Sequence, residues 1–360
     1  MKRYGILFTL LAAAVLGAAP AVETGELNGA AFRIDMPENW NGVLIVYCHG
    51  YNVKPVSYTG QKPEGLSVLA GAGFAVAQSG YSAGGWAIEE ALVDTEALRR
   101  HFIRKHGQPK RTYVTGHSMG GFLTMTILET QPNRYDGGLA LCGPLAPANH
   151  FLLRNVFDLL VVFEYFFPGA LPPPAKVPSD YTRTRERDAE IEKVLDGNPE
   201  RAGALRRLAG IRTNKELAAT LVFFTYILKD IQQRAGGNPF DNRNTIYGGT
   251  GDDNAVNDGV SRHAADPRAA EYVRTYYTPT GRLTRPLLHV HTTYDALVPS
   301  ATPNYYAELA GKTGSGELFV QQYVKSDGHC AIKPEQTTGA LADLRRWAET
   351  GARPAPGPRQ

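Results

Sequence analysis

Short apolar runs rich in β-branched residues alternate along the chain with longer segments whose apolar residues recur at helical spacing. Runs of the first kind occupy residues 43–47, 73–77, 111–115, 137–142, 287–290 and 318–324. Apolar runs of this length, bounded by turn-forming residues, are typical of strands that are buried on both faces. Helical spacing is found over residues 65–72, 87–106, 121–129 and 305–310, and again near the end of the chain. This alternation predicts an α/β fold with a mostly parallel sheet covered by helices on both faces.

The alternation stops between residues 147 and 280, where the pattern is mainly helical. Residues 151–167 are strongly apolar, but Arg154, Asp158 and Glu164 argue against a membrane-spanning helix. We expect this stretch to pack on the core or to line an apolar cleft. Because the insertion leaves the sheet after one predicted strand and returns before another, it can fold over the edge of the sheet.

One helix of the insertion has clear boundaries. Thr213 and Glu216 form a capping box, apolar residues follow on one face, and Gly236 is a typical C-terminal residue. The pattern therefore predicts an α/β core of residues 22–146 and 281–350, a helical insertion of residues 147–280 that acts as a cap, and a flexible tail of residues 351–360.

The first residues have the pattern of a signal peptide. Lys2 and Arg3 precede an apolar run over residues 6–16, and small residues follow, including Ala19 and Ala21. The apolar run is shorter than the about 20 residues that span a bilayer, so a membrane anchor is the less favoured alternative. We expect residues 1–21 to be removed and the mature protein to be secreted or periplasmic, without an integral membrane span.

Composition narrows the classes of function. The 360 residues are 43% hydrophobic and carry a formal charge of +3, which indicates a globular protein and no nucleic-acid partner. Three cysteines, Cys48, Cys142 and Cys330, cannot all pair within one chain, so a disulfide-rich scaffold is excluded. Buried thiols are the simpler interpretation. No cysteine or histidine spacing supports a metal site, and nothing points to a cofactor.

A sharp turn that carries a candidate catalytic serine lies between the third predicted strand and the helix after it. Gly116, His117, Ser118, Met119 and Gly120 form the pattern G-x-S-x-G. Two glycines remove side chains that would clash in such a turn, and the serine hydroxyl is raised above the carboxyl edge of the sheet. The Met119 N–H starts the helix and is free to stabilise an anion.

With this motif the chain resembles the α/β-hydrolase family over roughly residues 25–145 and 283–350. That resemblance implies the order nucleophile, acid, histidine, which here gives Ser118, Asp295 and His329. His329 is the one histidine beyond the expected acid. Asp327 is an alternative acid, but it is only two residues from His329 and fits a solvated turn better. The resemblance also implies that the Tyr51 N–H joins Met119 in an oxyanion hole, with His49 as a structural residue.

Contacts to the substrate are predicted less sharply. Tyr81 and Trp86 follow a strand at the same sheet edge and either line the cleft or pack within a tight turn. Phe163 and Phe166 lie in the apolar part of the insertion, where packing in its own core is the alternative to substrate contact. The aromatic residues of the insertion exceed what a small helical unit needs for its own core: Phe157, Phe163, Tyr165, Phe166, Phe167, Phe223, Phe224 and Tyr226. They predict a roofed apolar pocket that favours aryl or medium-chain esters over charged substrates. An acidic run over residues 252–258 departs from a calcium loop at Val256.

The function expected is an exported serine hydrolase that cleaves a small-molecule or polymeric carboxylic ester through an acyl-enzyme, without a cofactor. A peptidase or amidase with the same three residues is the alternative, because such a triad serves both ester and amide. A binding protein that has lost activity on the same fold is a third possibility.

Overall fold

A computed structural model describes residues 21–59 and 66–359. Their strands form one mixed sheet in the order β1-β2-β4-β3-β5-β6-β7-β8-β9. Strands β1 and β2 are antiparallel to their neighbours, and β3 to β9 run parallel. The bounds are β1 (Ala21–Leu27), β2 (Ala30–Met36), β3 (Val43–Cys48), β4 (Ala75–Ser79), β5 (Arg111–His117), β6 (Gly137–Leu141), β7 (Leu287–Tyr294), β8 (Phe319–Asp327) and β9 (Gly357–Pro358). The prediction of a mostly parallel sheet is confirmed.

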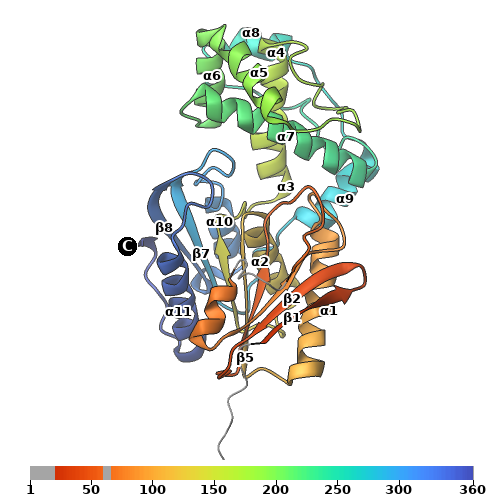
Figure 1. The fold of residues 1–360 in the computed structure, drawn as a ribbon. Coiled ribbons are helices and arrows are strands. Elements are labelled where there is room, and N and C mark those ends of the chain that lie inside the picture. Colours follow the sequence, from red (N-terminus) through yellow and green to blue (C-terminus); the bar gives the residue numbers. More distant parts are fainter. Residues whose placement is uncertain (1–20, 60–65, 360) are drawn as a thin grey trace, which may run out of the picture.

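Helices cover both faces of this sheet (Figure 1). One face packs against α1 (Ile88–His106), α2 (Met119–Thr130) and α10 (Asn304–Lys312), and the other against η1 (Ser67–Ala72) and α11 (Pro334–Thr350). Alternate residues of β3 belong to the two cores, because successive side chains of a strand point to opposite faces: Leu44 and Val46 face the first, Val43 and Ile45 the second.

The segment between β6 and β7 stands above the sheet as a separate layer of helices (Figure 1). It comprises α3 (Ala148–Phe151), the π-helix η2 (Leu152–Phe157), α4 (Asp158–Phe166), α5 (Arg185–Asp196), α6 (Pro199–Ala209), α7 (Asn214–Ala235), α8 (Asp253–Gly259) and α9 (Pro267–Tyr277). The Thr213–Glu216 capping box begins α7 as predicted. Long helix α7 lies between the outer helices of the insertion and the core (Figure 1).

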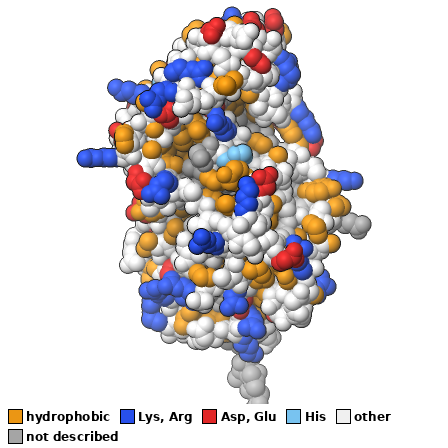
Figure 2. Space-filling view, turned by 180° about the vertical axis from the view of Figure 1, so that it is seen from behind, with side chains coloured by type: hydrophobic (Ala, Val, Ile, Leu, Met, Phe, Trp, Pro, Cys, Tyr) orange, Lys and Arg blue, Asp and Glu red, His pale blue; other side chains and the backbone are white. Residues whose placement is uncertain are grey.

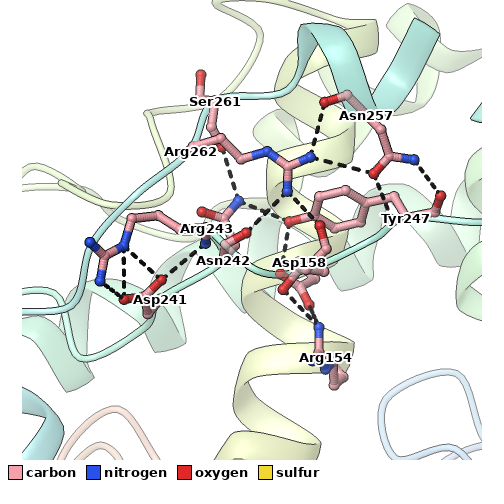
Figure 3. Close-up of polar contacts among 10 residues, drawn as sticks. Arg154, Asp158, Asp241, Asn242, Arg243, Tyr247, Asn257, Ser261 and Arg262 are labelled. Carbon is pink, nitrogen blue, oxygen red and sulfur yellow. Dashed lines mark hydrogen bonds and ion pairs between the residues drawn. The ribbon is translucent and has the colours of Figure 1, made fainter. Parts of the chain in front are cut away.

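A buried polar cluster holds the insertion together (Figure 3). Asp158 of α4 accepts hydrogen bonds from the Tyr247 hydroxyl at 2.9 Å and from Arg154 at 2.9 Å. The Asn242 amide donates to the same tyrosine oxygen, and Arg262 donates to the backbone oxygens of residues 242 and 245. These contacts fasten the long loop after α7 onto helix α4. The loop needs them because it has little regular secondary structure of its own.

The insertion is anchored to the core on two sides. On one side, Asp230 of α7 accepts from the Trp86 amide at 2.5 Å, and Arg234 pairs with Glu90 at 2.9 Å. On the other side, Arg212 donates to Asp327 at the end of β8. The insertion is therefore tied to both halves of the sheet edge on which Ser118 lies.

One element was not expected, one expectation is corrected, and one lies mostly outside the described residues. The hairpin β1–β2 was not predicted, although Asn28 and Gly29 both adopt positive φ in its two-residue turn. The tail is not frayed up to residue 359: β9 pairs with β8, and Arg359 donates to Asp343, so these contacts order it. Most of the predicted signal peptide, residues 1–20, lies outside the described residues.

Candidate active site

Ser118 lies in a strained turn between β5 and α2. Its φ of 57° and ψ of −121° belong to a region that non-glycine residues rarely adopt. The turn also needs Gly116 and Gly120, since a Cβ on Gly120 would stand 1.9 Å from the carbonyl oxygen of Cys48 and one on Gly116 would stand 2.5 Å from it. Close packing of β3 against the turn therefore excludes other residues at both glycines and raises the serine above the sheet.

The structure brings the three predicted catalytic residues into one hydrogen-bonded relay. Ser118 Oγ lies 2.8 Å from His329 Nε2, and His329 Nδ1 lies 2.7 Å from Asp295 Oδ2. The residues come from the ends of β5, β7 and β8, which meet at the carboxyl edge of the sheet. In this geometry Nδ1–H donates to the carboxylate, so Nε2 is left to accept the serine proton.

The Asp295 carboxylate is buried and supported by the backbone. Its Oδ1 accepts hydrogen bonds from the amides of Leu297 at 2.8 Å and Val298 at 3.0 Å. Burial alone would raise the pKa of this carboxyl, but the hydrogen bond and charge of His329, together with those two amides, outweigh burial and hold the pKa below its ordinary value. The group therefore remains an anion beside the imidazole.

Asp327, the alternative acid, points elsewhere. Its carboxylate pairs with Arg212 of the insertion at 2.6 Å, and about two thirds of its side chain is exposed. The structure thus gives this residue a partner in the insertion, whereas Asp295 is the one that contacts His329.

A disulfide lies beside the relay. Cys142, directly after β6, is bonded to Cys330, the residue after His329, so the interpretation of three buried thiols holds only for Cys48. Cys330 Sγ is 3.6 Å from His329 Nε2. The Ser118 amide donates to the oxygen of Leu141, one residue before Cys142. The bond therefore ties the histidine loop to the strand that supports the serine turn, and no local sequence pattern indicated this pairing.

The two expected oxyanion donors belong to segments that lie against Ser118. The Met119 amide opens α2, and the loop of Gly50 and Tyr51 runs against the serine: a Cβ on Gly50 would lie 3.3 Å from the Cβ of Ser118. In the described part of the chain neither the Met119 N–H nor the Tyr51 N–H has a hydrogen-bond acceptor. Both amides are thus free to bind an oxyanion.

Two other histidines near the site, His49 and His117, are packed rather than paired with Ser118. The His49 ring stacks on Tyr81 at 3.9 Å, and burial lowers its pKa. Burial, with the nearby His329, lowers the pKa of His117 to about 4. Tyr81 is only 1% exposed and donates to the oxygen of His49, so the prediction that it contacts substrate is wrong, because its ring fills the layer beneath the site.

Ser118 and His329 open onto an apolar cavity of about 380 Å³ between insertion and core. Figure 2 shows one face of the molecule, on which hydrophobic side chains surround an exposed histidine surface, with Lys or Arg side chains close by. The core and the insertion both line the cavity, with Gly50, Tyr51, Asn52, Val53, Trp86, Ser118, Pro144, Leu297, Val298, His329 and Cys330 from the first and Phe151, Arg183, Phe223, Phe224, Tyr226 and Ile227 from the second. The predicted contact by Trp86 is therefore sterically available.

Phe163 and Phe166 do not line the cavity, so their predicted role in substrate binding is corrected. Both lie on α4, where Phe163 stacks on Phe167 and Phe166 packs against Tyr165. Their part of α4 faces the outer helices of the insertion. Phe151 and Arg183 line the cavity instead, and sequence reasoning missed both, since no local pattern distinguishes a cavity-facing residue from one that packs.

The described residues contain neither a cluster of metal ligands nor a membrane-spanning helix. No group of three or more His, Cys, Asp and Glu side chains in residues 21–59 and 66–359 is arranged to hold a metal ion. In the acidic run, Asp252 caps α8 by accepting from the Ala255 amide, and Asp253 accepts from the Thr250 amide in the turn before that helix. Within the same ranges, no helix combines the length and the apolar character needed to cross a membrane.

Known proteins resemble this chain in sequence and in fold. Residues 44–204 match the family model described as serine aminopeptidase, S33. Over 93% of its length the chain is 22% identical to an o-phthalyl amidase from Xanthobacter agilis, 89% of which is covered. An esterase from Aspergillus oryzae superposes with a TM-score of 0.51 at 14% identity, over 91% of this chain and 78% of the esterase.

A longer relative is an acylaminoacyl peptidase, which is 11% identical with a TM-score of 0.48; the match covers 94% of this chain, which spans only 42% of the peptidase. The sheet order, the strained serine turn after β5 and the helical segment after β6 are typical of the α/β-hydrolase fold. The fold of this chain is therefore that of the α/β-hydrolases.

Proposed function

We propose that the protein is an exported serine hydrolase that cleaves a carboxylic ester through an acyl-enzyme. The observation that carries the proposal is the relay of Asp295, His329 and Ser118, which ends in an apolar cavity on a serine with two free amides beside it. A serine hydroxyl is a weak nucleophile near neutral pH, so its attack requires a base in hydrogen-bond contact.

The reaction proceeds in two halves. Ser118 Oγ attacks the carbonyl carbon while its proton passes to His329 Nε2, and the amides of Met119 and Tyr51 stabilise the oxyanion. The bond to the leaving oxygen then breaks, and His329 returns the proton to the departing alcohol. Water attacks the acyl-enzyme with His329 as base, the serine is released with its proton, and the acid product leaves. Asp295 holds the imidazole tautomer throughout.

An amide substrate is the second candidate, and one specific observation favours it. The o-phthalyl amidase matches 93% of this chain, including the insertion that lines the cavity. The same residues serve this reaction, because His329 can protonate an amine leaving group as it does an alcohol. Ester and amide differ here only in the leaving group.

Export is supported by the cysteine chemistry. The Cys142–Cys330 disulfide is of the kind that persists in oxidising compartments, which agrees with the signal-peptide pattern of residues 1–21.

The proposal is tested by labelling the purified protein with a fluorophosphonate and then measuring turnover of a panel of aryl esters and aryl amides. We expect covalent labelling of the native protein, no labelling of Ser118→Ala, and a loss of kcat of about 10⁴-fold or more in that variant. Ser300→Ala is the matched control, since Ser300 donates only to the oxygen of Thr293 and does not line the cavity. Full labelling of Ser118→Ala at another residue would refute the assignment.

A further inference from the structure

One side chain gives the cavity wall a permanent positive charge. Arg183, from the loop before α5, lines the same cavity as Ser118. Among the described residues that line it, none is Asp or Glu, and most are aromatic or aliphatic. An arginine remains charged at every relevant pH, so an otherwise apolar cavity contains a cation with no anion of its own on the wall.

Arg183 is held on the wall that leads to the oxyanion amides. Its guanidinium carbon lies 5.1 Å from the ring centroid of Phe223, within the range of a cation–π contact. The Phe223 ring in turn meets the Tyr51 ring edge-on at 5.4 Å. The charge is therefore two ring contacts away from Tyr51, the expected second oxyanion donor.

The charge is also poorly compensated, in contrast to that of three other arginines in the insertion. Its nearest carboxylate is that of Asp188, at 3.7 Å, beyond hydrogen-bond distance. Arg154, Arg212 and Arg234 have carboxylate partners at 2.9 Å or less. About two fifths of the Arg183 side chain is exposed. Its planar set of donors is therefore available to a ligand in the cavity.

We propose that Arg183 binds a carboxylate on the substrate, and that the natural substrate class is aryl esters or amides that carry one free carboxylate. This inference rests on the proposed function, because it places the cleaved bond at Ser118. A guanidinium can hold a carboxylate through two parallel hydrogen bonds, while the aromatic wall takes the ring between that carboxylate and the cleaved bond. The expectation that neutral esters are favoured is reversed by this residue.

The test compares phenyl benzoate with two isosteric anions, phenyl 3-carboxybenzoate and 3-carboxyphenyl benzoate, which carry the carboxylate on the acyl and the leaving side. We expect one of the anions to exceed phenyl benzoate in kcat/KM by about fivefold to tenfold at low salt, a ratio that shrinks as salt is added. In Arg183→Ala the ratio should fall to about one, and Arg183→Lys should retain part of it. Asp188→Asn should keep or increase the ratio.

Arg185→Ala is the matched control, since Arg185 is exposed, close in sequence and absent from the cavity wall, and it should leave the ratio unchanged. A ratio of one in the native protein, or a ratio that survives Arg183→Ala, would overturn the inference. Calorimetric binding of the same three esters to Ser118→Ala, with and without Arg183→Ala, separates the two hypotheses. Preferential binding of an anion without turnover in the native protein would refute the proposed hydrolysis but keep the role of Arg183.

Discussion

The molecule contains two buried polar networks of similar size, one at the edge of the sheet and one inside the insertion. In the first, Asp295 contacts His329, and His329 contacts Ser118 at the cavity wall. In the second, Asp158 contacts Tyr247 and Arg154, and the tyrosine oxygen is shared with Asn242 (Figure 3). The first network ends on an atom that faces an open cavity, while the second returns its hydrogen bonds to the protein.

The pKa values of the two carboxyl groups, Asp158 and Asp295, are shifted in opposite directions although both groups are buried. Burial is the largest influence on both, and it raises the pKa of Asp158 above its ordinary value despite the hydrogen bonds from Tyr247 and Arg154. At Asp295 the histidine and two backbone amides reverse that effect. Fixed amides aimed at an anion keep it charged, and a charged acid is what a histidine base requires. A buried carboxylate therefore indicates chemistry only when its surroundings keep it ionised and its network reaches a cavity.

The largest expected effect comes from breaking the first network. Asp295→Asn should lower kcat by about 10³- to 10⁴-fold, because the amide favours the wrong imidazole tautomer and no longer offsets its positive charge. Asp327→Asn should change kcat by less than about threefold, since Asp327 pairs with Arg212 on the surface. Steady-state kinetics on one aryl ester measure both. A larger loss in Asp327→Asn would reverse the choice of acid.

The second-largest effect is expected from removing the disulfide. This bond lies beside the first network, and the second network has no counterpart to it. The double variant Cys142→Ala/Cys330→Ala opens a loop with a sequence separation of 188 residues. We expect the free energy of unfolding to fall by about 2–4 kcal/mol and kcat to fall by about tenfold, because the His329 loop loses its covalent tether. Urea unfolding and kinetics with and without reductant give both values, and Cys48→Ala, which removes the buried free thiol, is the control. An unchanged kcat would show that the hydrogen bonds alone position His329.

Breaking the second network should affect stability and leave the chemistry alone. Asp158→Ala leaves the Tyr247 hydroxyl and Arg154 without their shared acceptor, so we expect the free energy of unfolding to fall by about 2–3 kcal/mol. The kcat/KM of the folded variant should remain within about threefold of the native value. Tyr247→Phe removes one hydrogen bond and should cost about 1 kcal/mol. A large loss of kcat/KM in Asp158→Ala at full folding would make the insertion network part of the site.

The smallest expected effect concerns a buried polar residue with no network at all. His289 on β7 is fully buried, and neither ring nitrogen has a hydrogen-bond partner in the described part of the chain. Burial, with the neighbouring His291, holds its pKa well below the ordinary value. The unfolded chain therefore takes up the proton first, near pH 6.5. Stability is complete above that pH and falls as the pH drops below it, by at most about 1.4 kcal/mol per pH unit from this group.

His289→Leu should therefore reduce the loss of stability between pH 7.5 and pH 5 by about 1–2 kcal/mol. Urea unfolding at the two pH values, on the native protein and the variant, measures the difference. An identical pH dependence in both would mean that other groups, such as the buried His117, carry the acid sensitivity.

The sequence by itself determined the features that depend on residues close together in the chain. Apolar runs of strand length predicted β3 to β8, and the capping box at Thr213 predicted the start of α7. The glycines around Ser118 indicated the strained turn, because that backbone conformation is decided within a few residues. The Asn28–Gly29 turn signal for β1–β2 was also local, so that hairpin was predictable in principle.

Only the tertiary structure decided which distant residues share a surface. The pairing of Cys142 with Cys330, the contact of Asp327 with Arg212 and the order of the C-terminal tail all join segments far apart in sequence. Whether Phe163 or Phe151 lines the cavity depended on how the segment of α3, η2 and α4 packs against α7. Periodicity predicts that a side chain is buried but not what it is buried against, because burial is set by the apolar stripe and its partner is set by the packing of whole helices and strands.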